Sequence, residues 1–266
     1  MRYLKVFAVL AVAVASTGCL RLTYTLNLKP DGSGTISSTF AVAQTMMAQA
    51  GALLGAGGSM FPTEDQMRES AKGMGGGVRF VNTTPYKTGG FEGVTALYAF
   101  DDLNKLTLNM EQAISGSVNA PSMIDGQLDP AADLKFSFTR EGDRTVLLLV
   151  MPEVPEPDDT MKQQAQAAAT QTQDPAVDAM MKQLMGGLLM EVAINVEGKI
   201  LKTNAPYVEG SRVVLLRLEG DELIKSSQGL GPLLQLGSGG NVQQMLSKVP
   251  GLKVVTLPEV RIEFSK

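Results

Sequence analysis

Apolar and small polar residues alternate in short runs along much of this chain. The clearest run begins near residue 20, where the apolar positions are Leu22, Tyr24, Leu26 and Leu28. A period of two residues predicts a strand with one buried and one polar face. The turn sequence Asp31-Gly32-Ser33-Gly34 separates this run from a second β-prone run at 35–42, so the two runs predict a hairpin.

Similar runs predict strands along the rest of the chain, at 78–82, 93–100, 134–139, 145–151, 188–196, 199–204, 212–218 and 253–264. The pair at 134–139 and 145–151 reads as another hairpin, joined through Glu141-Gly142-Asp143. The three runs between 188 and 218 are separated by short turns, so we expect an antiparallel meander there.

Helical patterns fall mainly in two blocks. Residues 44–56 are rich in Ala, Met and Leu, and residues 175–185 follow an Asp-Pro start. Between the blocks, Thr63 followed by Glu64, Asp65 and Gln66 predicts an N-cap and a short helix to about Met74. The expected fold class is therefore α+β, mainly an antiparallel sheet of hairpins and a meander, with two helical blocks covering one face.

The first 18 residues have the pattern of an export signal. Arg2 and Lys5 precede an apolar run at 6–15, which is followed by Ser16, Thr17 and Gly18. A membrane span needs about 20 apolar residues, so ten are too few. The segment predicts a secretory signal peptide that is removed at its small residues.

Cys19 is the only cysteine of the chain, so no intramolecular disulfide can form. The sequence Ser16-Thr17-Gly18-Cys19 resembles the lipobox of bacterial lipoproteins, in which the cysteine sulfur receives diacylglycerol and palmitate-type chains anchor the protein. The family prefers a branched apolar residue where Ser16 stands. Leu20 follows the cysteine. An Asp at this position would resemble the signal that retains lipoproteins in the inner membrane, so the periplasmic face of the outer membrane is favoured in a Gram-negative host.

These observations divide the chain into four parts. Residues 1–18 form the signal peptide, and 19–151 form the N-terminal part of an α+β body. Residues 152–174 are acidic and Pro-rich, then Gln- and Ala-rich, which is typical of a linker or a helix. Residues 175–266 form the C-terminal part of the same body.

Composition narrows the chemistry further. Loss of Arg2 and Lys5 with the signal lowers the basic residues from 23 to 21 against 27 acidic ones, a net charge of −6, so neither nucleic acid nor anionic lipid is an expected electrostatic partner of the chain as a whole. The chain contains no histidine, which excludes Ser-His-Asp and Cys-His nucleophile systems and His-ligated metals. We expect no enzymatic activity, no cofactor and no metal. The acidic pairs Asp101-Asp102 and Asp158-Asp159 and the segment 219–222 are interpreted as caps and solvated loops, not as acid/base groups.

An uncharged stretch at 32–63 and two methionine-rich regions suggest an apolar site. Fifteen methionines are present, and methionine adapts to apolar ligands of different shapes. The candidate lining residues are Met46, Met47, Leu53, Met181 and Met185. The alternative is that these residues are ordinary core beneath helices that cover the sheet.

Several patches resemble LppM-type bacterial lipoproteins. They are Gly18-Cys19-Leu20-Arg21, the segment 31–35, the segment 93–102, and Val196-Glu197-Gly198-Lys199-Ile200 with Thr203-Asn204. The resemblance implies an envelope lipoprotein with a compact α+β domain and lipid or glycolipid as its expected ligand. The chain departs from the family at Glu197-Gly198, where a Pro-Gly turn is usual, and lacks the C-terminal membrane helix of some members.

Two functions follow as hypotheses. One is a non-enzymatic, membrane-anchored envelope lipoprotein that binds lipid, glycolipid or another apolar ligand. The other is a structural or assembly lipoprotein that docks on an envelope protein partner through its uncharged stretches. A closed cavity would favour the first, and a large exposed apolar patch would favour the second.

Overall fold

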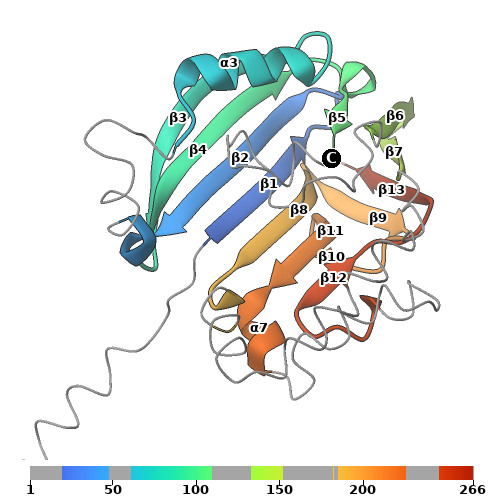
Figure 1. The fold of residues 1–266 in the computed structure, drawn as a ribbon. Helices are drawn as coiled ribbons and strands as arrows, with labels where there is room; N and C mark the ends of the chain where they lie inside the picture. The colour runs from blue at the N-terminus through green and yellow to red at the C-terminus, as the bar shows by residue number, and fades with distance from the viewer. Residues whose placement is uncertain are drawn as a thin grey trace, which may run out of the picture.

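The structure is a computed structural model that describes residues 20–47, 61–109, 133–151, 182, 185–225 and 246–265 (Figure 1). In these ranges the chain forms two sheets. The larger sheet has the order β10 (Val208–Glu209), β11 (Arg212–Glu219), β8 (Leu189–Val196), β1 (Leu20–Leu28), β2 (Gly34–Ala43), β4 (Phe91–Phe100) and β3 (Arg79–Thr88), with β12 (Leu252–Val254) on β11. The smaller sheet has the order β5 (Leu108–Asn109), β6 (Asp133–Glu141), β7 (Arg144–Val150), β13 (Glu259–Ser265) and β9 (Lys199–Thr203).

The predicted N-terminal hairpin is confirmed as β1 and β2. They pair antiparallel from Leu20 opposite Val42 to Leu28 opposite Gly34. Asp31 Oδ1 accepts hydrogen bonds from the backbone N–H of Ser33 at 2.9 Å and from its hydroxyl at 2.6 Å. These bonds tighten the turn, and Gly32 supplies the positive φ of 85° that it needs.

The predicted meander is wrong. β8 lies beside β1 in parallel register, and β11 pairs with the other side of β8. β9, which follows β8 directly in sequence, instead pairs with β13 in the smaller sheet. The alternation of residues predicts which side of a strand is buried, but it does not select the neighbouring strand.

Two strand boundaries also differ from the prediction. The run at 253–264 forms two strands, β12 and β13, which belong to different sheets. The strand predicted at 78–82 continues as β3 to Thr88, through Pro85. Proline is tolerated there because β3 is an edge strand.

The predicted capped helix is confirmed as α3 (Glu64–Gly73), which lies over β3 (Figure 1). Thr63 Oγ1 accepts from the backbone N–H of Gln66 and the Gln66 side chain accepts from the N–H of Thr63, a capping box. Met67 and Ala71 are its buried residues. Of the two predicted helical blocks, residues 44–47 are helical; residues 48–56 and most of 175–185 lie outside the described residues.

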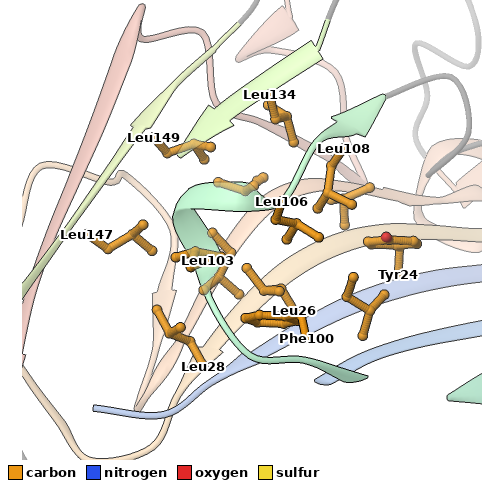
Figure 2. Close-up of a cluster of buried hydrophobic side chains, with 14 of the residues drawn as sticks. Tyr24, Leu26, Leu28, Phe100, Leu103, Leu106, Leu108, Leu134, Leu147 and Leu149 are labelled. Carbon is orange, nitrogen blue, oxygen red and sulfur yellow. The ribbon is translucent and has the colours of Figure 1, made fainter. Parts of the chain in front are cut away.

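The two sheets share a hydrophobic core. The large sheet contributes Leu26, Leu28 and Phe100, and Leu147 and Leu149 face them from β7 (Figure 2). The 3-10 turn η1 (Leu103–Lys105) inserts fully buried Leu103 between them. Each such side chain stabilises the fold by about 1.5–3 kcal/mol through burial.

A separate cluster of Leu22, Phe40 and Val42 lies near the start of β1. Partly buried apolar side chains pack around it: Leu20, Met47, Phe61 and Met190. In the part of the chain that the structure describes, no helix combines the length and apolar character needed to cross a bilayer.

Candidate functional site

The predicted methionine lining is only partly described. Met47 packs against the cluster of Leu22, Phe40 and Val42, whereas Met46 packs against Ala41, Ala43 and Phe91. Because residues 40 and 41 point to opposite faces of β2, the two methionines contact opposite faces of the large sheet. Met185 lies beside the start of β8, where its carbonyl accepts from the N–H of Leu188 at 3.0 Å. Leu53 and Met181 lie outside the described residues, and a shared lining remains a prediction.

A recess of about 260 Å³ lies beside β12. Its walls combine apolar and polar groups: Asn204, Pro206, Tyr207, Leu246, Ser247, Val254, Thr256 and Leu257. The Asn204 amide is already engaged, since its Nδ2 donates to the Glu259 carbonyl at 2.9 Å and its Oδ1 accepts from the Arg261 N–H at 2.7 Å. These bonds hold the chain between β9 and β10 in place, so this wall of the recess is pre-formed.

A larger, more open recess of about 550 Å³ lies at the turn end of β1. Its lining is mostly polar and comes from both sheets: Lys29, Pro30, Asp31, Arg140, Gly142, Asp143, Thr145, Glu197 and Ser265. Arg140 Nε donates to the Pro30 carbonyl at 2.8 Å, which ties the β6–β7 hairpin to the β1–β2 turn. Hydrogen bonds from Ser33 lower the pKa of Asp31. The mixed charges do not favour an apolar ligand here.

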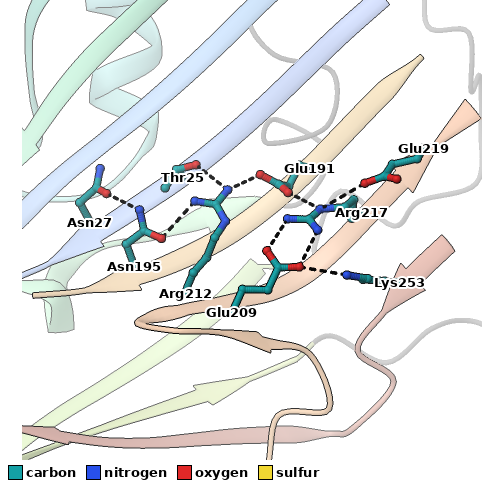
Figure 3. A network of polar contacts seen from close by, with 9 residues as sticks. All are labelled: Thr25, Asn27, Glu191, Asn195, Glu209, Arg212, Arg217, Glu219 and Lys253. Carbon is teal, nitrogen blue, oxygen red and sulfur yellow. Dashed lines mark hydrogen bonds and ion pairs between the residues drawn. The ribbon is translucent and has the colours of Figure 1, made fainter. Parts of the chain in front are cut away.

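Polar side chains form a network on the outer face of the large sheet (Figure 3). Glu191 on β8 accepts hydrogen bonds from both Arg212 and Arg217 on β11. Arg217 also makes a bidentate pair with Glu209, over 2.6 and 2.9 Å, and Lys253 Nζ donates to Glu209 at 3.0 Å. The Glu191 side chain is only 10% exposed, so its charge depends on these partners.

The electrostatics of this network are those of a structural ion-pair cluster. Hydrogen bonds from Arg217 and then Lys253 lower the pKa of Glu209 to about 2. The same bond to Glu209, followed by the bond to Glu191, raises the pKa of Arg217. Both groups therefore stay charged at neutral pH, and neither is poised to exchange a proton.

Arg21 on β1 has an unusual environment. Its guanidinium lies 4.2 Å from the centre of the Phe91 ring, and Nη1 donates to the Tyr86 hydroxyl at 3.3 Å. Its Nε is buried and has no hydrogen-bond partner within the described part of the chain. No carboxylate among the described residues forms an ion pair with it.

The described residues of the predicted acidic segments make capping and ion-pair contacts. Asp102 caps η1, accepting from the Asn104 N–H at 3.0 Å, which lowers its pKa, and Asp101 pairs with Arg79 at 3.0 Å. Glu222 pairs with Lys225 within α7 (Gly220–Lys225). Asp158 and Asp159 lie outside the described residues. Within the described ranges, no group of three or more His, Cys, Asp or Glu residues could hold a metal ion.

The sequence did not point to Arg21 or to the Glu191 network. One sequence signal was available for both residues. Within each strand apolar and polar residues alternate, and Arg21 and Glu191 stand at polar positions, which predicts that they lie on the outer face of the sheet. The partners Tyr86, Arg212 and Arg217 come from other strands, and only strand pairing brings them near.

No family model matches the chain, and no curated protein matches it. Among solved structures, the chain is similar to the NMR structure of the folded domain of LppM from Mycobacterium tuberculosis. The alignment covers 93% of this chain and 90% of that domain, with 11% sequence identity and a TM-score of 0.35. This is a distant likeness.

Proposed function

We propose that this protein is an exported envelope lipoprotein, held at a membrane by lipid on Cys19, whose body binds an apolar or amphiphilic ligand without catalysis. The observation that carries the proposal is the position of Cys19. It ends a signal-like segment, and Leu20, the next residue, begins strand β1. The folded body thus starts where a lipoprotein signal peptidase would leave the acylated residue.

The chemistry of the chain supports a binding role over a catalytic one. Histidine is absent from the sequence. The described carboxylates with shifted pKa values, Asp31, Asp102 and Glu209, are each held by hydrogen bonds in turns or ion pairs. A general acid or base needs a pKa near the working pH, and these pKa values are all lowered.

The recess beside β12 is the proposed ligand site among the described residues. Tyr207, Val254 and Leu257 give it apolar walls, and Ser247 and Thr256 add hydroxyl groups. Its 260 Å³ lies just below the usual range of small-molecule sites, which suits a single acyl segment or a similar group with a polar end. A lipid or glycolipid is therefore the proposed ligand class.

Fatty-acid labelling tests the anchor. Cys19→Ala should abolish incorporation of radiolabelled palmitate and release the protein from membranes, because no other cysteine can replace it. Ser16→Leu is the matched control, since it leaves Cys19 in place and should label at least as well as the wild type. Labelling of the Cys19→Ala variant would overturn the anchor.

Native mass spectrometry and a fluorescent fatty acid test the ligand site. Protein purified without its anchor should carry lipid, and Leu246→Ser with Leu257→Ser should weaken binding of the probe. Leu201→Ser is the control, because Leu201 is 48% exposed on β9 and does not line the recess. Probe binding that is lost instead on polar replacement of Met46, Met47 and Leu53 would move the site to the methionine-rich block. A wild type that binds no lipid and no probe would favour the structural or assembly role.

A further inference from the structure

The tether between the proposed anchor and the folded body is extremely short. Cys19 is followed immediately by Leu20, the first residue of β1. Adjacent Cα atoms are about 3.8 Å apart, so an acyl chain on Cys19 holds the first residue of the sheet close to the lipid headgroups. This inference rests on the proposed lipid anchor. Its consequence is that one end of the large sheet, not an arbitrary face, must meet the bilayer.

Strand register identifies the residues at that end of the sheet. Leu20 is paired with Val42, Arg21 with Leu189 on the other side, and Ala43 with Phe91. The hairpin between β3 and β4, at Gly89 and Gly90, lies at the same end. We call this set of strand ends the anchor end (Figure 1).

The anchor end carries half-buried apolar side chains on the inner side of the sheet. They are Leu20, Met47, Phe61 and Met190, packed around Leu22, Phe40 and Val42. This cluster is separate from the main core, which fills the space between the two sheets. Apolar side chains that keep part of their surface in water gain free energy when they enter the interfacial layer of a bilayer.

The outer side of the anchor end carries a cation, Arg21, that contacts two aromatic side chains. Arg21 stacks on Phe91 and donates to Tyr86, while its Nε lacks a partner among the described residues. Glu92, the residue after Phe91, is paired with Val42 and so faces the opposite side of the sheet, where Lys87, at 3.4 Å, and the Gln44 amide, at 2.9 Å, engage its carboxylate. A guanidinium without a carboxylate suits an oxyanion such as a lipid phosphate, which it binds through several N–H groups.

Charge restricts the contact to one part of the anchor end. The short helix α7, which follows β11, carries Asp221 and Glu222 in its first turn. Anionic headgroups would repel these carboxylates, so the contact should centre on the ends of β1, β2 and β4. Aromatic, arginine and aliphatic side chains in one place are typical of the water–bilayer interface.

We propose that the anchor end lies directly on the bilayer that holds the Cys19 lipid, with Arg21 binding the phosphate of a neighbouring phospholipid. The sheet then stands away from the membrane. β1 has nine residues, so its turn end with the polar recess lies about 27 Å farther out. The acyl chains provide the attachment, and the anchor end sets the orientation.

Site-specific fluorescence in vesicles tests this orientation with the full, lipidated chain. Acylation consumes Cys19, the only cysteine, so an introduced cysteine is the only site for a maleimide dye. Thr88→Cys places the dye at the anchor end, and Asp143→Cys places it in the β6–β7 turn at the other end; both residues are exposed. In vesicles of phosphatidylglycerol and phosphatidylcholine with nitroxide-labelled headgroups, the dye at 88 should be quenched several times more strongly than the dye at 143.

Arg21→Gln, made in the Thr88→Cys chain, tests the phosphate contact. The ratio of docked to undocked protein should fall by about fivefold, the effect of one basic residue at an anionic surface. Arg79→Gln is the matched control, since Arg79 begins β3 at the far end and is paired with Asp101. Arg21→Lys should retain much of the effect, and thermal unfolding of each variant reports whether the sheet is intact.

The outcomes separate the two proposals. If the wild-type chain is not acylated and does not bind vesicles, the proposed lipoprotein function is wrong and this orientation is wrong with it. If the chain is acylated and vesicle-bound but the dyes at 88 and 143 are quenched equally, the anchor stands and the orientation is overturned. If quenching at 88 persists unchanged in Arg21→Gln with an intact sheet, the role of Arg21 in binding phosphate is overturned.

Discussion

Asn195 Nδ2 donates a hydrogen bond of 2.9 Å to Oδ1 of Asn27, across the parallel register of β8 and β1. The two residues are 168 positions apart in sequence, and each faces the other directly. Arg212 extends the contact, since its Nη1 donates to Asn195 Oδ1 at 3.1 Å (Figure 3). A one-residue slip of β8 would break both bonds and turn its apolar side chains to the polar face, so the pair helps to specify the register.

Glu191 holds two arginines, and its replacement should destabilise the fold. Glu191→Gln removes the charge that neutralises Arg212 and Arg217 while keeping the size of the side chain. We expect the free energy of unfolding to fall by about 2 kcal/mol, less than for a fully buried pair, because the arginine side chains retain 24% and 15% exposure. Urea denaturation measures the change. Glu219→Gln should cost under about 0.5 kcal/mol, because its 3.8 Å contact is exposed, and equal effects of the two changes would contradict this account.

Glu209 should make stability depend on pH. Its pKa is about 2 in the folded protein and 4.5 without its partners, so it stabilises the fold above the unfolded pKa. This contribution is lost as the pH falls from about 5 to about 2. Its side chain is 40% exposed, and with the resulting solvent screening we expect about 1 kcal/mol. The measured quantity is the difference in unfolding free energy between the wild type and Glu209→Gln, which should narrow at acid pH; a constant difference would count against the pairing.

Gly93 is needed for the close pairing of β2 and β4. A Cβ atom there would lie 2.0 Å from the Phe40 carbonyl oxygen and 2.5 Å from Ala41 Cα, which are backbone atoms that cannot rotate away. Gly93→Ala should therefore destabilise the protein by about 1–3 kcal/mol. Gly76→Ala, where no described atom beyond the two neighbouring residues lies within 4 Å of the added carbon, should be neutral or slightly stabilising. Thermal unfolding of both variants distinguishes them, and similar melting temperatures would be inconsistent with the close approach.

The capping box of α3 makes a further measurable contribution. Thr63→Ala removes the acceptor for the Gln66 N–H, and we expect a loss of about 1 kcal/mol in unfolding free energy. Ser70→Ala, within the same helix, removes only a bond from its hydroxyl to the Gln66 carbonyl and should change stability by under about 0.5 kcal/mol. Chemical denaturation should show the larger effect at Thr63, and the reverse order would mean that the cap does not stabilise this helix.

Local features were predictable from the sequence alone. The alternation of Leu22 to Leu28 assigned one face of β1 to the core, and the turn at 31–34 joined it to β2. Thr63 predicted the start of α3, and Asp102, interpreted as a cap from the sequence, is the N-cap of η1. Each of these depends on contacts between residues close in sequence, so the pattern of residue types contains the needed information.

The candidate sites were less predictable. Met46 and Met47 are adjacent in sequence, yet they pack on opposite faces of the large sheet. The recess beside β12 combines Asn204 and Tyr207 with residues 246–257, and no spacing rule connects these segments. Composition predicted adaptable apolar side chains, but their location depends on where the strands carry them.

Strand partners and the division into two sheets were decided only by the tertiary structure. Every strand offers the same backbone hydrogen-bonding groups, so the sequence of β9 does not predict that β9 pairs with β13. Nor does it predict that β8 pairs with β1 and β11 instead of with β9. That choice follows from burying Leu147, Ile262 and their neighbours against Leu28 and Phe100 in one core. The period of two assigns a face to each strand through local geometry, whereas the choice of neighbours minimises the free energy of the whole packed chain.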